Sequence, residues 1–432
     1  MRELKSSGLE WIGKIPKDWT INRVKYIFDS GKGLSITKEN LVDGGLPVIS
    51  YGQIHSKTNN GVSIIPELLR FVDWKYSERF PQCYISQYDF VFADTSEDYD
   101  GCGNCAYKRD NSILFGGYHV VILHSKEKRD NRYLAYLFIT DEWRKQIRTV
   151  VSGVKVFSIT QKVIMNSSII LPSFEEQQKI SDYLDAKCTE INALSADIQS
   201  EIETLEAYKR SVITEAVTKG LNPESEMKYS GIEWVGNIPF NWQIEKGKYC
   251  LKYLQKPTKP DDDVITCFRD GEVTLRKNRR EEGFTISLQE IGYQGIDKGD
   301  LIVHGMDGFA GAIGISDSRG KASPVLNVLD TNHNKRYIMY YLRNMAYNGV
   351  FIALATGIRV RTCDTNWGKL RELPYILPPK EEQDRIVEYI DKKLFEVNSI
   401  TDEKRKQLEI LDEYKKSLIY EYVTGKKEVP AT

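Results

Sequence analysis

The chain contains two copies of one stretch of sequence, and this repeat is its strongest constraint on a fold. Residues 7–26 read SGLEWIGKIPKDWTINRVKY, and residues 230–249 read SGIEWVGNIPFNWQIEKGKY, at an offset of 223. A second pair lies at an offset of 206, where residues 171–177 read LPSFEEQ and residues 377–383 read LPPKEEQ. The chain therefore has the order A-B-A′-B′, and a tandem duplication of this kind builds a molecule with two similar working ends.

Each B segment has the pattern of a long helix. No proline or glycine occurs from Ser173 to Lys219, and apolar residues recur there in two tracks of period seven. The first track contains Leu184, Ile191, Ile198, Leu205 and Val212, and the second runs through Leu194 and Tyr208. The later copy has Ile390, Val397, Leu411 and Leu418 on one track, interrupted by Lys404, and Ile386, Ile400 and Tyr414 on the other. Two apolar tracks of this period predict that the helices pair as a coiled coil.

The A segments mix strand-like apolar runs, such as residues 119–123, with short helical patterns, such as residues 132–148. We therefore expect an α+β fold with two globular domains, residues 1–170 and 223–376, separated by two long helices in residues 171–222 and 377–432. Each helix buries its tracks best against the other, which predicts an antiparallel coiled coil and a pseudo-two-fold tandem repeat. About 45 helical residues would make a rod of about 67 Å.

Composition excludes several classes of protein. The chain has 432 residues and a formal net charge of −1, which argues against nonspecific coating of nucleic acid but leaves room for a local basic cleft. The first residues lack the apolar core of a signal peptide, and no run of about 20 apolar residues predicts a membrane span. Seven cysteines without a secretion signal indicate a reducing compartment, so we expect a cytoplasmic protein.

No motif predicts catalysis by this chain. A phosphate-binding GxxxxGK[ST] loop, an Asn/Asp-Pro-Pro-aromatic tetrad and an HExxH metal motif are all absent from the sequence. Cys102 and Cys105 form the only CxxC pair, but their glycine neighbours indicate a loop, and thiols without a ligand are the simpler interpretation. The acidic run Asp261–Asp263 could bind a metal, although runs of this kind usually serve as solvated loop or capping residues. We expect no catalytic residue, metal or cofactor here.

Taken together, the motifs resemble one known family. The W-[IV]-GxIPxxW start, the LPxxEEQ segment before each long helix and the two variable regions between them resemble type I restriction–modification specificity subunits over essentially the whole chain. The resemblance implies two target recognition domains that bind a bipartite, asymmetric site in double-stranded DNA. It also implies two methyltransferase subunits as partners and, in a restriction complex, two motor-nuclease subunits. Those partners would use S-adenosylmethionine, ATP and Mg, and this chain would be non-catalytic.

Base edges and phosphates are read by basic, amide and hydroxyl side chains in loops, and both A segments offer candidates. In the first domain these are Tyr51, Gln53, His55, Lys57, Ser96, Tyr118, His119, Ser152 and Lys155. In the second domain they are Arg276, Lys277, Arg279, Asp307, Thr356, Arg359 and Arg361. Ser152–Lys155 and Thr356–Arg359 each place a small residue, a glycine and a basic residue shortly before a long helix, and this matched position favours them.

Simpler interpretations stay open at this stage. The basic cluster at 276–280 could be a solvated surface, Gly305–Gly308 could be a hairpin turn, and Arg359 or Arg361 could pair with a carboxylate such as Asp364. Two other functions also stay open. A coiled-coil scaffold with protein-binding heads would show no DNA affinity even with its partners present, and a self-contained nuclease would cleave DNA alone with a metal.

Overall fold

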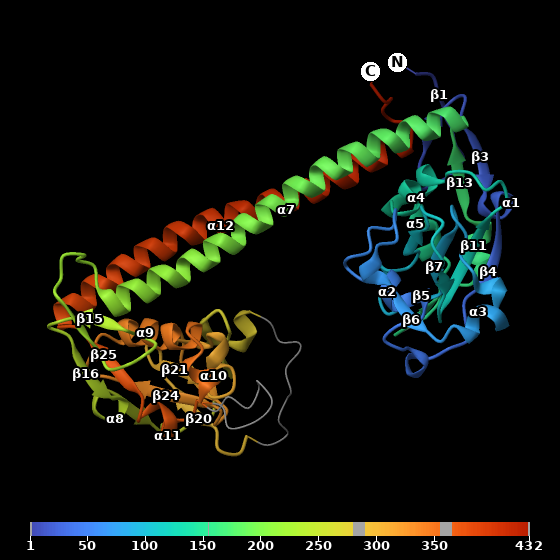
Figure 1. Cartoon of the computed structure of the whole chain (residues 1–432). Coiled ribbons are helices and arrows are strands. Elements are labelled where there is room, and N and C mark those ends of the chain that lie inside the picture. The colour runs from blue at the N-terminus through green and yellow to red at the C-terminus, as the bar shows by residue number, and fades with distance from the viewer. Residues whose placement is uncertain (1, 154, 280–289, 355–364, 431–432) are drawn as a thin grey trace. The chain divides into compact units, whose positions relative to one another are not determined.

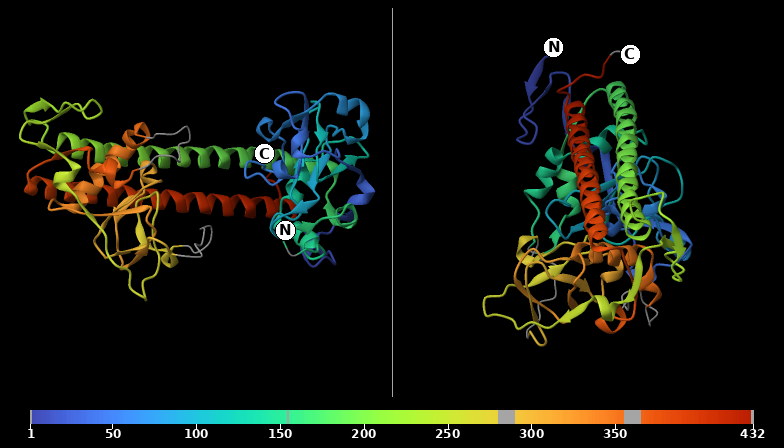
Figure 2. Two further views of the ribbon diagram at one scale, coloured as in Figure 1. Left: turned by 90° about the horizontal axis from the view of Figure 1, so that it is seen from below. Right: turned by 90° about the vertical axis from the view of Figure 1, so that its left-hand side faces the viewer.

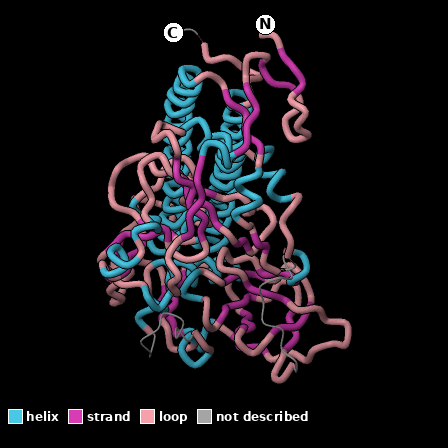
Figure 3. The backbone as a smooth tube through the Cα atoms, turned by 90° about the vertical axis from the view of Figure 1, so that its right-hand side faces the viewer, coloured by secondary structure: helices cyan, strands magenta, loops and turns pink. Residues whose placement is uncertain are grey.

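The computed structural model describes residues 2–153, 155–279, 290–354 and 365–430. It divides into two units, the first made of residues 1–197 with 407–432 and the second of residues 198–406. Each unit contains an α+β head together with part of each long helix (Figure 1). Strands and helices are mixed within the heads (Figure 3), as the sequence pattern predicts.

A four-stranded antiparallel sheet forms the centre of the first unit. Its order is β4-β11-β7-β9, with bounds Phe28–Lys32, Val120–Ser125, Phe90–Ala93 and Cys105–Tyr107. A second sheet has the order β10-β5-β6, with bounds Phe115–Gly116, Leu46–Ile49 and Arg70–Val72. Paired strands are β1 (Leu4–Ser6) with β2 (Lys14–Pro16), β3 (Thr20–Arg23) with β13 (Ser168–Leu171), and β8 (Thr95–Ser96) with β12 (Phe157–Ser158). Short helices are α1 (Val24–Ile27), α2 (Tyr51–Ile54), α3 (Lys75–Arg79), α4 (Arg132–Phe138), α5 (Asp141–Arg148) and α6 (Gln161–Asn166).

The second unit repeats this sheet. Its order is β17-β24-β21-β22, with bounds Lys252–Leu254, Leu326–Asp330, Leu301–His304 and Ile313–Ile315. Paired strands are β14 (Met227–Tyr229) with β15 (Asn237–Pro239), β16 (Gln243–Lys246) with β25 (Pro374–Leu377), β18 (Ile265–Cys267) with β19 (Val273–Leu275), and β20 (Gln294–Ile296) with β23 (Gly320–Ala322). Short helices are α8 (Gly247–Cys250), α9 (Lys335–Tyr347), α10 (Val350–Ala353) and α11 (Trp367–Leu370). The α+β class and the internal repeat are thus confirmed.

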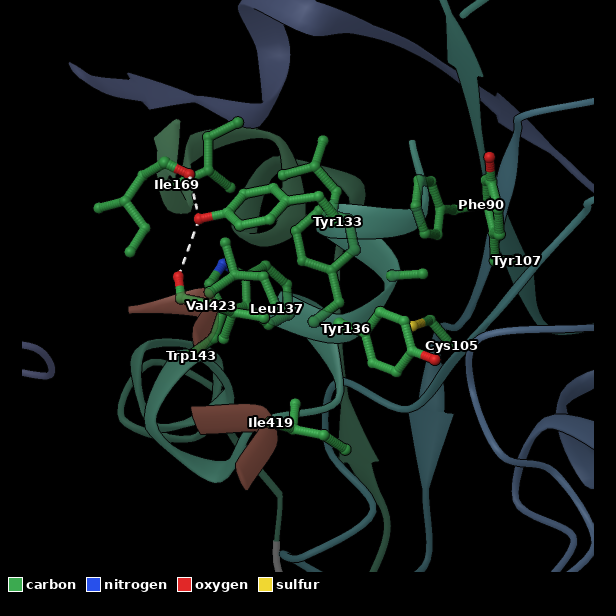
Figure 4. Packing of buried hydrophobic residues seen from close by; sticks show 14 of the residues in the cluster. Phe90, Cys105, Tyr107, Tyr133, Tyr136, Leu137, Trp143, Ile169, Ile419 and Val423 are labelled. Atoms are coloured by element: carbon green, nitrogen blue, oxygen red, sulfur yellow. Dashed lines mark hydrogen bonds between the residues drawn. The ribbon is translucent and has the colours of Figure 1, made fainter. Parts of the chain in front are cut away.

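Continuous apolar strands place the core between the sheet and its helices. All four residues of β7 are buried, as expected for a short strand without polar positions. The ring of Phe90 lies 4.7 Å from Tyr107 on β9 and 5.0 Å from Phe138 on α4, and Phe138 lies 4.4 Å from Trp143 on α5. Figure 4 shows Phe90, Tyr107 and Trp143 in this packing. The core therefore holds α4 and α5 firmly against the sheet.

Two long helices, α7 (Phe174–Lys219) and α12 (Lys380–Val423), pass from one unit into the other. In the first unit the beginning of α7 pairs with the end of α12, where the Tyr183 and Tyr422 rings lie 4.6 Å apart. In the second unit the end of α7 pairs with the beginning of α12, where Lys209 donates to Asn398 at 2.9 Å. Within each unit the helices therefore run antiparallel and side by side (Figure 1 and Figure 2).

The second track expected on the helix seam is wrong at four of its five positions, and only Ile386 on α12 is buried. The first track of α7 is buried or half-buried, but Leu194 and Tyr208 are 48% and 47% exposed. Ile400 and Tyr414 of α12 are likewise exposed. In α7 the partner track is Cys188, Ser195, Ile202 and Lys209, four residues after each first-track position instead of three, with Cys188 and Ile202 buried and Ser195 and Lys209 half-buried. Two paired helices bury only one narrow stripe of each helix surface. Because this track includes the polar residues Ser195 and Lys209, a search for apolar residues did not identify it.

The repeated tryptophan motif seats the end of a long helix in each unit. Gly220 and Gly425 follow α7 and α12 with φ of 74° and 68°, the left-handed conformation of a helix C-terminus. A Cβ at Gly220 would lie 3.1 Å from the Trp242 ring, and a Cβ at Gly425 would lie 3.1 Å from the Trp19 ring and closer still to Pro16. The repeated W-x-G-x-I-P-x-x-W sequence is therefore a structural joint between head and helix.

Candidate nucleic-acid interface

Four of the ring side chains selected from the sequence come together in the first unit. The ring of Tyr51, at the start of α2, lies 6.2 Å from His55, 5.6 Å from Tyr118 and 5.5 Å from His119. The backbone N–H of Tyr51 donates to the carbonyl of Tyr118 at 3.3 Å, which joins two loops that are distant in sequence. We call these four residues the aromatic cluster.

The two histidines of the cluster differ in exposure and in how many of their ring nitrogens contact other groups of the protein. His119 has φ of 56° and a side chain that is 56% exposed, with Nδ1 3.2 Å from the Asp94 carboxylate. A non-glycine residue in this conformation is uncommon and costs energy, a feature that concentrates at functional positions. His55 instead uses both ring nitrogens, Nε2 at 2.8 Å from the Thr95 carbonyl and Nδ1 at 3.0 Å from the Asn104 amide. His119 is therefore the better candidate for contact with a ligand.

Two other candidates support the loops from inside. Ser96 is 1% exposed, and its hydroxyl donates to the carbonyl of Asp98 at 2.7 Å. The oxygen of the Gln53 side chain accepts from the backbone N–H of Ser50 at 3.2 Å, which caps α2. Ser96 lies too deep to reach DNA in this structure, so we assign it to shaping the loop.

The loop before α6, which contains Ser152 and Lys155, lies beside the aromatic cluster. Ser152 forms an antiparallel bridge with Ser158, and Ser158 pairs with Thr95 in the β12–β8 ladder. The Thr95 carbonyl is the one that His55 contacts. Lys155 is exposed on this loop, and Lys57 is exposed just after α2. The structure therefore brings three separately selected loops of the first unit into one neighbourhood.

A groove of about 740 Å³ opens beside His119, and its lining includes basic residues that sequence analysis missed. Its polar lining residues are Lys32, Ser35, Asp94, Thr95, Tyr118, His119, Ser158, Thr160, Gln161 and Lys162. Lys32 ends β4 and Lys162 lies in the first turn of α6, and both are exposed. Nothing in the sequence distinguishes these two lysines from other surface lysines. They line one groove only because the fold brings β4 and α6 together. The two lysines could contact phosphates of a DNA backbone, and the neighbouring hydroxyl and amide groups could contact an adjacent base edge.

Replacing Lys32 and Lys162 together by alanine is expected to weaken DNA binding most at low salt. Each phosphate contact contributes about 0.9 to the slope of log affinity against log salt, so the slope should fall by roughly 2. Titration of the assembled complex with its DNA at several salt concentrations measures this. Alanine at Lys5 and Lys14, which removes the same charge outside the groove, should leave the slope unchanged. A slope unchanged in the groove variant would contradict this assignment.

In the second unit the corresponding loop is anchored at an equivalent position. The backbone N–H of Ile159 donates to the carbonyl of Asp94 at 2.7 Å in the first unit. In the second unit the N–H of Thr365 donates to the carbonyl of Gly305 at 2.9 Å. Ile159 and Thr365 are related by the repeat offset of 206, and Asp94 and Gly305 follow equivalent strands, β7 and β21. Ile159 and Thr365 are therefore each hydrogen-bonded to the residue that follows the equivalent strand of their own sheet.

The residues that follow these anchors also match. The side chain of Thr160 caps α6, and the side chain of Asn366 caps α11, each by accepting from a backbone N–H three residues later. Thr356, Arg359 and Arg361, which were expected to contact DNA, lie outside the described residues. The structure describes the residues that follow them, of which Thr365 and Asn366 correspond to Ile159 and Thr160.

The described members of the basic cluster in the second unit make contacts within the protein, and Arg280 lies outside the described residues. Lys277 lies 2.5 Å from Asp263, and Arg279 lies 2.6 Å from Asp270. Arg276 donates to the hydroxyl of Thr266 at 3.3 Å. These contacts agree with the simpler interpretation of the cluster as a charged surface, and they do not test its binding to DNA.

Asp307 begins a turn after β21, where its carboxylate accepts from Arg269 at 2.8 Å. It lies near the anchored end of the loop, because the side chain of Thr365 donates to the carbonyls of His304 and Gly305, both at 2.9 Å. Arg269 is 58% exposed. Arg269 and Asp307 therefore form a partly exposed polar pair at the end of β21, on the same strand end as the anchor of Thr365.

The described residues contain no group of three or more His, Cys, Asp or Glu side chains that could hold a metal. In the acidic run, the Asp262 carboxylate forms an ion pair with the Arg319 guanidinium at 2.8 Å. Cys102 and Cys105 are both buried, and burial raises the pKa of the Cys105 thiol to about 12. A thiol of this kind is neutral and unreactive. Within the four described ranges, no helix has the length and apolar character needed to cross a membrane.

Comparison with known proteins agrees with these features. Residues 16–204 match the family model of the type I restriction modification DNA specificity domain. The putative type I restriction enzyme MjaX specificity subunit of Methanocaldococcus jannaschii is 25% identical over 438 residues, which cover 97% of this chain and 96% of that one. The StySPI specificity subunit of Salmonella potsdam is 21% identical over 394 residues, which cover 88% and 82%.

A solved chain from work on complex assembly and conformational transition of the type I R-M system has the same fold. Its TM-score is 0.67 at 15% identity, and the match covers 96% of this chain and 99% of that one. The duplicated head, the paired long helices and these matches define a DNA specificity protein. Residues 16–204 therefore match a type I DNA specificity domain, and over almost its whole length the chain is similar to type I restriction enzyme specificity subunits.

Proposed function

We propose that this chain recognises a bipartite, asymmetric site in double-stranded DNA, one half-site with each head. The target recognition domains would be residues 1–170 and 223–376, joined by helical segments 171–222 and 377–432. The main support is that the two heads share one frame but carry different residues on it. The anchors at Ile159 and Thr365 are equivalent. Near its anchor the first head has the aromatic cluster with His119, whereas the second head has the Arg269–Asp307 pair. Equivalent frames with different side chains suit two different half-sites.

The chemistry of the first-unit groove supports contact with DNA. The ammonium groups of Lys32 and Lys162 can bind phosphates. The Gln161 amide and the His119 imidazole can donate hydrogen bonds to base edges and accept them. The Gln161 side chain already donates to the carbonyl of Gly31 at 3.1 Å, which fixes its orientation. A groove with both kinds of group offers positioning and reading in one place.

The chain is the non-catalytic subunit of its system, and we propose that it positions two methyltransferase subunits on the DNA. Exposed apolar residues recur at equivalent positions in both units, at an offset of 223. Leu4 and Met227 are 51% and 38% exposed, and Tyr26 and Tyr249 are 63% and 73% exposed. An apolar residue on a surface that contacts only water can be replaced by a polar one without loss. Exposed apolar residues at equivalent positions in both units therefore favour binding of two copies of one partner.

Catalysis and its cofactors would belong to these partners. Methyl transfer to adenine from S-adenosylmethionine would occur in the methyltransferase subunits, with the target base flipped out of the duplex. A restriction complex would add two motor-nuclease subunits that use ATP and Mg. We propose that the assembly acts in the cytoplasm, where its DNA is accessible.

Replacing Tyr118 and His119 together by alanine tests the division of labour between the heads. Each lost base contact is worth about 1–3 kcal/mol of discrimination, so one half-site should become degenerate at one or two positions. The other half-site should remain as in wild type, because its head is unchanged. Methylome sequencing of cells that contain the complex reads both halves at once. Degeneracy in both halves, or in neither while methylation persists, would contradict the proposal.

A further inference from the structure

In each head, several side chains donate hydrogen bonds to one carboxylate near the beginning of a long helix. In the first unit Asp185 on α7 accepts from Arg109, from Arg132 and from the hydroxyl of Tyr136, each at 2.6 Å. In the second unit Asp391 on α12 accepts from Arg336 and from the hydroxyl of Tyr340, each at 2.5 Å. We call these groups the first and second helix anchors.

The two anchors are copies of one device. Arg132 and Tyr136 lie four residues apart on α4, and Arg336 and Tyr340 lie four residues apart on α9, so each pair presents two donors on one helix face. Asp185 and Asp391 are related by the offset of 206 that relates the long helices. The arginine–tyrosine–aspartate arrangement thus persists in two heads that differ in their loops.

The anchors are directional contacts at the joint between head and helix. Asp185 and Asp391 are 24% and 36% exposed, so neither is part of the closed core. Apolar packing would hold the two parts together but tolerate sliding, whereas several charge-assisted donors on one carboxylate fix an orientation. Burial alone would raise the pKa of Asp185, but hydrogen bonds from Arg109, Tyr136 and Arg132 outweigh it, and the pKa is lowered. The first anchor is therefore charged at neutral pH.

We propose that Asp185 and Asp391 are positioning residues that determine which spacer length between the two half-sites is accepted. The inference rests on the proposed function, in which each head reads one half-site. Adding one base pair to a spacer moves a half-site by about 3.4 Å and turns it by about 35° around the duplex axis. A head would have to tilt on its helix to follow, and the anchors oppose that tilt.

The two anchors differ in strength, which adds a second expectation. A third donor, Arg109, reaches Asp185 and also donates from Nε to the carbonyl of Val62 at 2.9 Å. In the second unit the position two residues after β22, which corresponds to Arg109 after β9, is occupied by the acidic Asp317. Loss of the first anchor should therefore relax spacer selection more than loss of the second.

The test uses the full chain in complex with its methyltransferase subunits and a DNA library. The library contains the wild-type half-sites, once mapped, with spacers one base pair shorter, native, and one or two base pairs longer. For Asp185→Asn we expect methylation at shifted spacers, relative to the native spacer, to rise about tenfold, as for loss of a strong charge-assisted contact. Asp391→Asn should give a smaller rise of about threefold, and both half-sites should stay unchanged.

Asp182→Asn is the matched control. Asp182 lies on the same helix and contacts the same Arg132 at 2.9 Å, but it is 67% exposed, so its loss should leave spacer selection as in wild type. Tyr136→Phe removes one donor with the carboxylate intact and should give a partial relaxation. It keeps the test decisive if the complex with Asp185→Asn does not methylate.

The outcomes separate the two proposals. A purely structural role would lower methylation equally at every spacer, and spacer selection unchanged in the Asp185→Asn, Asp391→Asn and Tyr136→Phe complexes that methylate would overturn the inference. Absence of any split motif in wild type would instead overturn the proposed function, before the anchors come into question.

Discussion

Replacing Trp19 by alanine is expected to lower the free energy of unfolding of the first unit by about 3–5 kcal/mol. Trp19 is fully buried, and its ring meets that of Tyr133 edge-on at 6.1 Å. Its indole N–H donates to Glu176 at the beginning of α7 at 3.1 Å. The same ring seats Gly425 after α12. One truncation therefore loosens the head from both long helices at once.

Urea unfolding of the full chain, with hydrogen exchange followed in each unit, measures this loss. Exchange should rise in the first unit and stay close to wild type in residues 198–406. Trp74→Ala is the matched control, because Trp74 is 53% exposed and its loss should cost less than about 0.5 kcal/mol. A cost below about 1 kcal/mol for Trp19→Ala would show that the motif is not the joint described here.

Inserting four residues into the middle of α7 is expected to lengthen the unread spacer by one or two base pairs. Four residues add about 6 Å of rise and a net rotation of about 40° to an α-helix. A base-pair step adds about 3.4 Å and turns the duplex by about 35°. Neither head is altered by the insertion, so both half-sites should keep their bases.

Methylome sequencing of the insertion variant gives the spacer and the half-sites together. Replacing four exposed residues in the same stretch of α7 without changing its length is the control, and the wild-type spacer is expected there. Altered bases within a half-site, with the spacer unchanged, would contradict the assignment of reading to the heads and spacing to the helices.

The repeat and the long helices were predictable from sequence because their signals are local. Proline and glycine are absent over the whole of α7, and the motif around Trp19 recurs around Trp242. The register of the seam was not, because its partner track includes Ser195 and Lys209, and an apolar pattern selects Leu194 and Tyr208 instead. Polar seam positions can be recognised only when the facing helix is known.

The candidate site was predictable in part. The loops that carry Tyr51, Tyr118 and His119 were selected by their polar and glycine-rich sequence, and the structure joins them. Ser96 was selected on the same grounds but is buried, because loop sequence does not show which side chain turns inward. Lys32 was missed because its place beside His119 depends on the pairing of β4 with β11.

The most direct measurement of the central claim is single-molecule methylome sequencing of a methylation-free host that expresses this chain with its methyltransferase subunit. The account predicts one new motif made of two short, different blocks separated by a gap of fixed length. A single uninterrupted motif, or no new methylation by a complex shown to be assembled, would contradict the claim that two heads read two half-sites.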